Sequence, residues 1–170
     1  SVSDGVKHFP ELDVWLGARG PWRSTVSSYD QIWKKPYSVA GTGGALSVLW
    51  HEKVGALFTA SMAEYIMVEP NNQQKQPGED FCLTPRVERF VGEEWFANIH
   101  DLKAKVNFSD ENGVLDFKVN ALLTNREKDA VSNQGEIQLN YLFDATKVVI
   151  KANRSSDENN GDTLVLPIIS

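Results

Sequence analysis

Side chains that can move protons or bind a polar ligand gather between Gly43 and Gln74. His51 and Tyr65 can each donate or accept a proton, and Arg86, a little further along, can neutralise a carboxylate. A turn after the sequence EP holds four carboxamides in succession, which can donate hydrogen bonds to hydroxyl or carboxylate oxygens. These are Asn71, Asn72, Gln73 and Gln74. The stretch therefore predicts acid–base chemistry or the binding of a polar ligand.

Neighbouring strands are predicted to position these side chains. From Ala45 to His51 the residues alternate, which places Leu46, Val48 and Trp50 on one face and His51 on the other. We therefore expect Trp50 in the core. Residues 54–60 and 63–68 are rich in β-branched, aromatic and small residues, which favours two more strands. Antiparallel pairing would bring His51 close to Tyr65.

The segments LSVLWH, TASMAEY and VEPNNQQ, in this order, resemble the β-sheet region of the heparinase II/III-like polysaccharide lyases. The resemblance implies the C-terminal sheet domain of an enzyme that cleaves uronate-containing polysaccharide by β-elimination. It also implies a helical toroid domain that completes the substrate cleft. No toroid is present in this sequence, so the chain would be a fragment or a stand-alone relative, inactive by itself, and periplasmic or secreted in a bacterium.

Within this resemblance, His51 and Tyr65 would transfer protons. Arg86 and the four carboxamides would bind the acidic substrate. The family's metal-bearing members use a histidine-rich motif, whereas only His51 lies in this stretch, so no metal and no cofactor are expected. His8, His51 and His100 also stand far apart in the sequence, without the spacing of a local zinc site.

Two other functions fit the same residues. A non-catalytic carbohydrate-binding module would use exposed indoles, and Trp15, Trp22 or Trp33 could supply such a stacking platform. A structural β-sandwich that supports a catalytic domain elsewhere is the second alternative. In either case His51 and Tyr65 would be ordinary residues of the sheet.

Composition limits the class of protein. The chain of 170 residues is long enough for one sizeable core, so we expect a single domain over 1–170. It begins at Ser1 rather than methionine, which we interpret as a processed or truncated product. Cys82 is the only cysteine, so no internal disulfide can form. No apolar run is long enough to cross a membrane.

The distribution of charge suggests where an acidic ligand would bind. The net charge is −6, which argues against nucleic acid as a partner. Residues 1–90 contribute −1 and residues 91–170 contribute −5. We therefore expect an acidic polysaccharide to meet the first half of the chain.

The sequence predicts an all-β fold, an antiparallel β-sandwich of about ten strands. Residues 1–40 are expected to be irregular, because glycines and prolines interrupt them. The second half alternates apolar and polar residues over 114–123 and 137–143, with turn signals such as NG and DENNGD between the runs. Such regularly spaced strands typically pair as two packed sheets.

Overall fold

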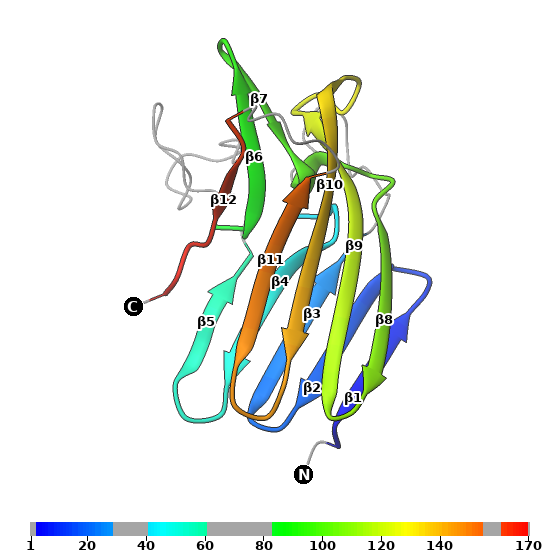
Figure 1. Cartoon of the computed structure of the whole chain (residues 1–170), viewed down its shortest axis with the longest axis vertical. Helices are drawn as coiled ribbons and strands as arrows, with labels where there is room; N and C mark the ends of the chain where they lie inside the picture. The colour runs from blue at the N-terminus through cyan, green and yellow to red at the C-terminus, as the bar shows by residue number, and fades with distance from the viewer. Residues whose placement is uncertain (1–2, 29–40, 61–82, 155–160, 170) are drawn as a thin grey trace, which may run out of the picture.

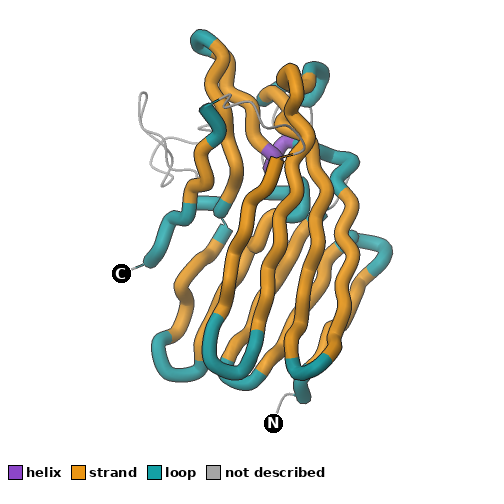
Figure 2. Tube along the Cα trace, in the orientation of Figure 1, coloured by secondary structure: helices purple, strands orange, loops and turns teal. Residues whose placement is uncertain are grey.

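The computed structural model describes residues 3–28, 41–60, 83–154 and 161–169, which fold as two antiparallel sheets packed face to face (Figure 1, Figure 2). The first sheet has the order β1-β2-β3-β4-β5, and in Figure 1 it lies behind the second. Its strands are β1 (Gly5–Phe9), β2 (Val14–Arg19), β3 (Trp22–Ser27), β4 (Ala45–His51) and β5 (Gly55–Thr59). The prediction of an all-β sandwich is confirmed.

The second sheet has the order β11-β10-β9-β7-β6-β12, with β8 paired to β9 outside this path. A single turn of 3-10 helix, η1 (Asn98–His100), follows β7. The strands are β6 (Arg86–Val91), β7 (Glu94–Ala97), β8 (Lys105–Glu111), β9 (Val114–Asn125), β10 (Val131–Phe143), β11 (Val148–Arg154) and β12 (Thr163–Val165).

The core lies between the sheets and is built by alternating residues of β9 and β10. The predicted runs over 114–123 and 137–143 are confirmed, because within them every second side chain is buried while the residues between them face outward or are half-buried. The first sheet meets them with Trp15, Val26 and Leu46. The buried members from β9 and β10 are Leu115, Phe117, Val119, Ala121, Leu123, Ile137, Leu139, Tyr141 and Phe143.

The prediction that residues 1–40 are irregular is wrong for the part that the structure describes. Residues 5–9, 14–19 and 22–27 form β1 to β3, joined by antiparallel pairing. Gly17 is paired inside β2, whereas Gly20 has a φ of 51° in the β2–β3 turn, so the glycines do not interrupt the sheet. This turn chemistry suits tight hairpins, which explains why three short strands fit into so few residues.

The prediction that Trp50 is in the core is also wrong. β4 pairs with β3 through a register shift, in which Thr25 opposes Val48 but Val26 opposes Leu46, so Ser47 is the extra residue of a bulge. A bulge reverses the faces of all residues beyond it. Leu46 and Leu49 are consequently both buried, and Trp50 is 37% exposed.

β9 has different partners along one edge. β8 pairs with it from Val114 to Asn120, and β7 pairs with it only at Thr124 and Asn125. The short gap between them is bridged by Asp101, whose carboxylate accepts the backbone N–H of Leu122 at 2.8 Å. The same carboxylate accepts the backbone N–H of Lys103 at 2.8 Å. The divided edge therefore leaves a notch in the second sheet.

The loop before β4 is fastened to η1 by a buried asparagine. The Asn98 amide donates to the carbonyl oxygen of Gly43 at 3.0 Å, and its side-chain oxygen accepts the N–H of Val87 at 2.8 Å. Nearby, the Tyr141 hydroxyl donates to the carbonyl of Gly44 at 2.9 Å. These contacts hold the loop before β4 against η1 and β10. The backbones of the loop and of η1 therefore lie close together.

The last described segment covers the edges of both sheets. β12 pairs with β6, and the backbone N–H of Ile169 donates to the carbonyl of Leu57 in β5 at 2.9 Å. Asp162, just before β12, binds two arginines: Arg89 Nε at 2.5 Å and Arg154 Nε at 2.8 Å. Arg89 is only 3% exposed and also binds the Ser132 hydroxyl. A buried ionic cluster thus holds this segment in place.

Among the residues described, there is no helix that has the length and apolar character needed to span a membrane.

Candidate functional site

His51 lies at the end of β4, beside the β4–β5 turn at the bottom of Figure 1. Its ring meets the indole of Trp22 with centroids 4.5 Å apart and planes tilted by 59°. Nδ1 accepts the backbone N–H of Lys53 at 3.2 Å. The neutral ring therefore carries its proton on Nε2, which can donate it to a ligand. The imidazole is half-buried, so it is oriented by the protein and still reachable.

Arg23 and Trp50 lie next to this pair on adjacent strands. They oppose each other in the β3–β4 register, one residue from the opposed pair Trp22 and His51. Neighbouring positions on a strand point to opposite faces, so Arg23 and Trp50 share the outer face of the first sheet. The guanidinium of Arg23 donates to the carbonyl oxygens of Gly20 at 2.7 Å and Trp22 at 2.6 Å. A fixed cation and an exposed indole thus lie side by side.

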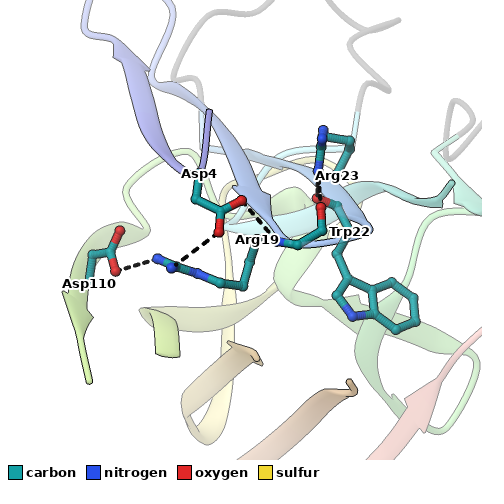
Figure 3. Close-up of polar contacts among 6 residues, drawn as sticks. Asp4, Arg19, Trp22, Arg23 and Asp110 are labelled. Atoms are coloured by element: carbon teal, nitrogen blue, oxygen red, sulfur yellow. Dashed lines mark hydrogen bonds and ion pairs between the residues drawn. The ribbon is translucent and has the colours of Figure 1, made fainter. Parts of the chain in front are cut away.

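A second arginine holds this end of the sandwich together (Figure 3). Arg19 pairs with Asp4 near the N-terminus at 3.5 Å and with Asp110 of β8, so it links the two sheets. The backbone N–H of Gly20 donates to the same Asp4 carboxylate at 2.9 Å. These contacts fix the β2–β3 turn, from which Trp22 and Arg23 project. The charges of Arg19 are matched by two carboxylates, so its role is to position the turn.

The indole N–H of Trp22 is buried and has no hydrogen-bond partner among the described residues. A buried donor without a partner is costly, by about 1–3 kcal/mol. Arg19 Nε and Ser24 Oγ, in β2 and β3, likewise have no hydrogen-bond partner among the described residues. A buried donor of this kind is usually satisfied by a water molecule or another polar group, so it does not by itself indicate a function.

Arg86 lies elsewhere, at the start of β6 in the second sheet. It is 6% exposed, and its Nε donates to Glu88 at 2.6 Å. Its guanidinium stands 5.5 Å from the ring centre of Trp95, whose indole N–H also donates to Glu88 at 3.0 Å. The structure does not bring Arg86 together with His51. Arg86 forms a buried cluster with the residues around it, and its role in binding substrate remains a prediction.

Tyr65 and the carboxamides Asn71, Asn72, Gln73 and Gln74 lie outside the described residues. Their predicted proximity to His51 stays a prediction. In the described ranges, no group of three or more His, Cys, Asp or Glu side chains is arranged to hold a metal ion.

Sequence reasoning did not identify Arg23 and Trp50. Arg23 stood in a segment interpreted as irregular, and Trp50 followed an alternation that the bulge interrupts. The residue types of Ser47, at the bulge, and Thr25, on the opposite strand, do not indicate a bulge. Of the predicted stacking platforms, Trp15 is buried against His8, Trp22 is half-buried, and Trp33 lies outside the described residues.

His100, in η1, is a buried histidine with a different character. It is 3% exposed, packs edge-on against Trp95 at 4.7 Å, and its Nδ1 contacts the carbonyl oxygen of Thr124 at 3.1 Å. Burial, aided by the nearby positive charges of Lys128 and Arg126, lowers the pKa of His100 from 6.5 to about 4, although the hydrogen bond to Thr124 acts in the opposite direction. The ring is therefore neutral in the folded protein at neutral pH.

This pKa predicts that acid destabilises the fold. Below pH 6.5 the unfolded chain binds a proton at His100 that the folded chain excludes until about pH 4. The free energy of unfolding should therefore fall by up to about 3 kcal/mol between these values. Urea unfolding at several pH values measures it. His100→Gln should remove this part of the pH dependence, and an unchanged profile in that variant would refute the assignment.

Comparisons with known proteins point to one family. The ulvan lyase C-terminal domain family matches residues 6–170. The broad-specificity ulvan lyase of Formosa agariphila is 44% identical over 172 residues, which cover 99% of this chain and 27% of the relative. This chain thus spans a little more than a quarter of the relative's length. No solved structure matches it. These findings support the C-terminal domain of a polysaccharide lyase, and they do not single out the heparinase II/III type.

Proposed function

We propose that this chain, which belongs to the ulvan lyase C-terminal domain family, is the β-sandwich part of a longer lyase acting on ulvan or a related acidic polysaccharide. The observation that carries the proposal is the similarity to the Formosa agariphila lyase. The two sequences are 44% identical over nearly the whole of this chain, and the matched part is 27% of that lyase. The remaining part of such an enzyme, a helical toroid in the heparinase-like case, would complete the cleft. We propose a periplasmic or secreted location for the whole enzyme.

The end of the sandwich around His51 supports a contribution to the cleft. A lyase that acts by β-elimination removes a proton beside the sugar carboxylate and protonates the leaving oxygen. His51, with its proton on Nε2, would suit the second step, and Tyr65 is proposed for the first. Arg23 and Trp50 face the outer side of the first sheet, opposite to His51, so they would bind a carboxylate and a sugar ring at another part of the same polymer. Arg86 and the four carboxamides, from Asn71 to Gln74, remain proposed substrate-binding residues.

A non-catalytic glycan-binding module is the second candidate. The observation that favours it is the exposed indole of Trp50 beside Arg23, which would bind an acidic sugar without any proton transfer. In that case His51 would only orient Trp22. The two candidates differ in the effect of His51 on turnover, which a single assay measures.

A chimeric enzyme tests the proposed function. The matching segment of the Formosa agariphila lyase is deleted in one protein and replaced by this chain in another. We expect the deletion to abolish product formation and this chain to restore it. The measurement is the rise in ultraviolet absorbance from the unsaturated uronate, with thermal melting to confirm that both proteins are folded. A folded chimera no more active than the deletion would contradict the proposal.

Variants of the chimera then separate catalysis from binding. His51→Ala and Tyr65→Phe should each lower kcat by about a hundredfold or more if these residues transfer protons. His8→Ala is the matched control, because it removes an imidazole of β1 that is stacked on Trp15 of β2. It should leave kcat within a few-fold of the parent. Unchanged kcat in both test variants, with a raised KM, would leave the glycan-binding candidate.

A further inference from the structure

The outer face of the second sheet carries two adjacent rows of lysines and carboxamides. Each row runs straight across β8, β9, β10 and β11, because the residues in it are register partners. Partners in register share one face of a sheet, and residues two apart along a strand do the same. We call these eight residues the lysine–carboxamide face. The first row is Lys105, Asn120, Gln138 and Asn153, and the second is Asn107, Lys118, Asn140 and Lys151.

The composition of this face is unusual for this chain. Its eight members include three lysines and no carboxylate, although the protein carries a net charge of −6. Seven of the eight are exposed, and Asn140 is half-buried. Asp116, in the next row, forms an ion pair with Lys118 at 3.7 Å and accepts a hydrogen bond from the Asn140 amide at 3.4 Å. Within the described part of the chain, the other six side chains make no hydrogen bond or ion pair.

A cavity of about 260 Å³ opens at the upper end of this face, where β9 leaves β8. It is the notch of the divided β9 edge, and its lining includes Lys103, Lys105, Asn120, Gln138 and Glu136. Asp101 also lines it, with its carboxylate already bound to two backbone N–H groups. Leu122 adds a half-buried apolar wall. Ammonium groups, carboxamides and one apolar wall are what a sugar ring with an acidic substituent requires.

We propose that the lysine–carboxamide face and its cavity bind an anionic oligosaccharide, with the lysines on its acidic groups and the carboxamides on its hydroxyls. This inference rests on the proposed function, because it supplies the acidic saccharide as the ligand. Lysine is a point charge with three donors, and a carboxamide both donates and accepts. The face thus forms a second glycan contact, apart from His51, that would hold the polymer during cleavage.

Another part of a longer lyase could instead cover this face. The exposed apolar side chains favour other surfaces for such a contact, since interface cores are depleted of charged residues. Phe90 and Val91, for example, are exposed at the end of β6. The lysine–carboxamide face has no exposed large apolar residue among its members.

The test is binding by this chain to ulvan, measured by isothermal titration calorimetry at low and physiological salt. The variant Lys105→Gln, Lys118→Gln, Lys151→Gln should bind on the order of tenfold more weakly, because each exposed charge contributes a small amount. Its affinity should also depend less on salt. Polygalacturonate, a polymer with carboxylates alone, should bind the parent, and neutral dextran should not.

A matched triple variant controls for net charge. Lys7→Gln, Lys128→Gln, Lys147→Gln makes the same change of three charges, at β1 and at two turns, away from the face. It should bind ulvan nearly as tightly as the parent. Asn120→Ala with Gln138→Ala keeps the charge constant and should weaken binding several-fold through the cavity. Thermal melting should show that all three variants are folded.

Three results would overturn the inference. These are no binding of ulvan by the parent chain, equal weakening by the two lysine triples, or tight binding of neutral dextran. An active chimera combined with any of them would leave the proposed function standing and remove only this second contact. An inactive chimera combined with specific binding at this face would contradict the proposed function and leave the binding face standing.

Discussion

Leu139→Asp is expected to unfold the protein at room temperature or to leave it barely stable. Leu139 is 2% exposed in β10, among the aromatic and aliphatic side chains that join the two sheets. A carboxylate there would lose its water without gaining a partner, which costs about 4 kcal/mol or more together with the lost apolar contact. Circular dichroism and urea unfolding measure the change.

Gln138→Asp is the control for this substitution, because it places the same carboxylate one residue away on the exposed face. It should change the free energy of unfolding by only about 0.5 kcal/mol. A Leu139→Asp protein that melts like the parent would show that the strand's buried face is assigned wrongly. A far-ultraviolet spectrum with more than about one third helix in the parent would contradict the sandwich itself.

Gly43→Ala is expected to be the most damaging change of a single methyl group. Gly43 has a φ of 66°, and a Cβ at this position would lie 1.6 Å from the carbonyl oxygen of Asn98. The left-handed backbone costs about 1–2 kcal/mol, and the steric conflict costs about 1–3 kcal/mol more. Neither backbone can retreat easily, because Asn98 is itself bound to Gly43 and Val87. Thermal and urea unfolding give the loss.

Gly113→Ala separates the two causes. Gly113 has a φ of 77° in the β8–β9 turn, but a Cβ there would meet nothing within 4 Å. This control should therefore lose only the backbone term, about 1–2 kcal/mol. If the two variants lose equal stability, the contact between the β4 loop and η1 is not the close packing described above.

The sequence predicts the second sheet well, because β9 and β10 alternate without interruption over 115–123 and 137–143. It predicts the first sheet less well. A single extra residue at Ser47 reverses the faces of β4, so Trp50 moves outward although its pattern is that of a core residue. The register of a bulge depends on the partner strand, which period-two patterns do not contain.

The candidate site shows the same limit. His51 could be singled out by its residue type, whereas Arg23 gains significance only from its position opposite Trp50. Charge summed along the sequence does not show how charge is distributed over the surface. Residues 91–170 carry −5 in total, yet the lysine–carboxamide face in them has no carboxylate among its members, because strand alternation sorts neighbouring residues onto opposite faces. The expectation that an acidic polysaccharide meets the first half of the chain stays a prediction.

The segment from 161 to 169 covers strand edges that would otherwise be open to other copies of the chain. β6 and β5 would otherwise present unpaired backbone N–H and C=O groups at the same side of the molecule, and such edges recruit strands from other copies. β12 occupies one edge, and Ile169 bonds to the other at Leu57. Because Asp162 is held by Arg89 and Arg154, this cover is fastened by charge. Because this cluster is buried, salt should screen it little, whereas loss of the Asp162 carboxylate should release the segment and favour aggregation through β-strand addition.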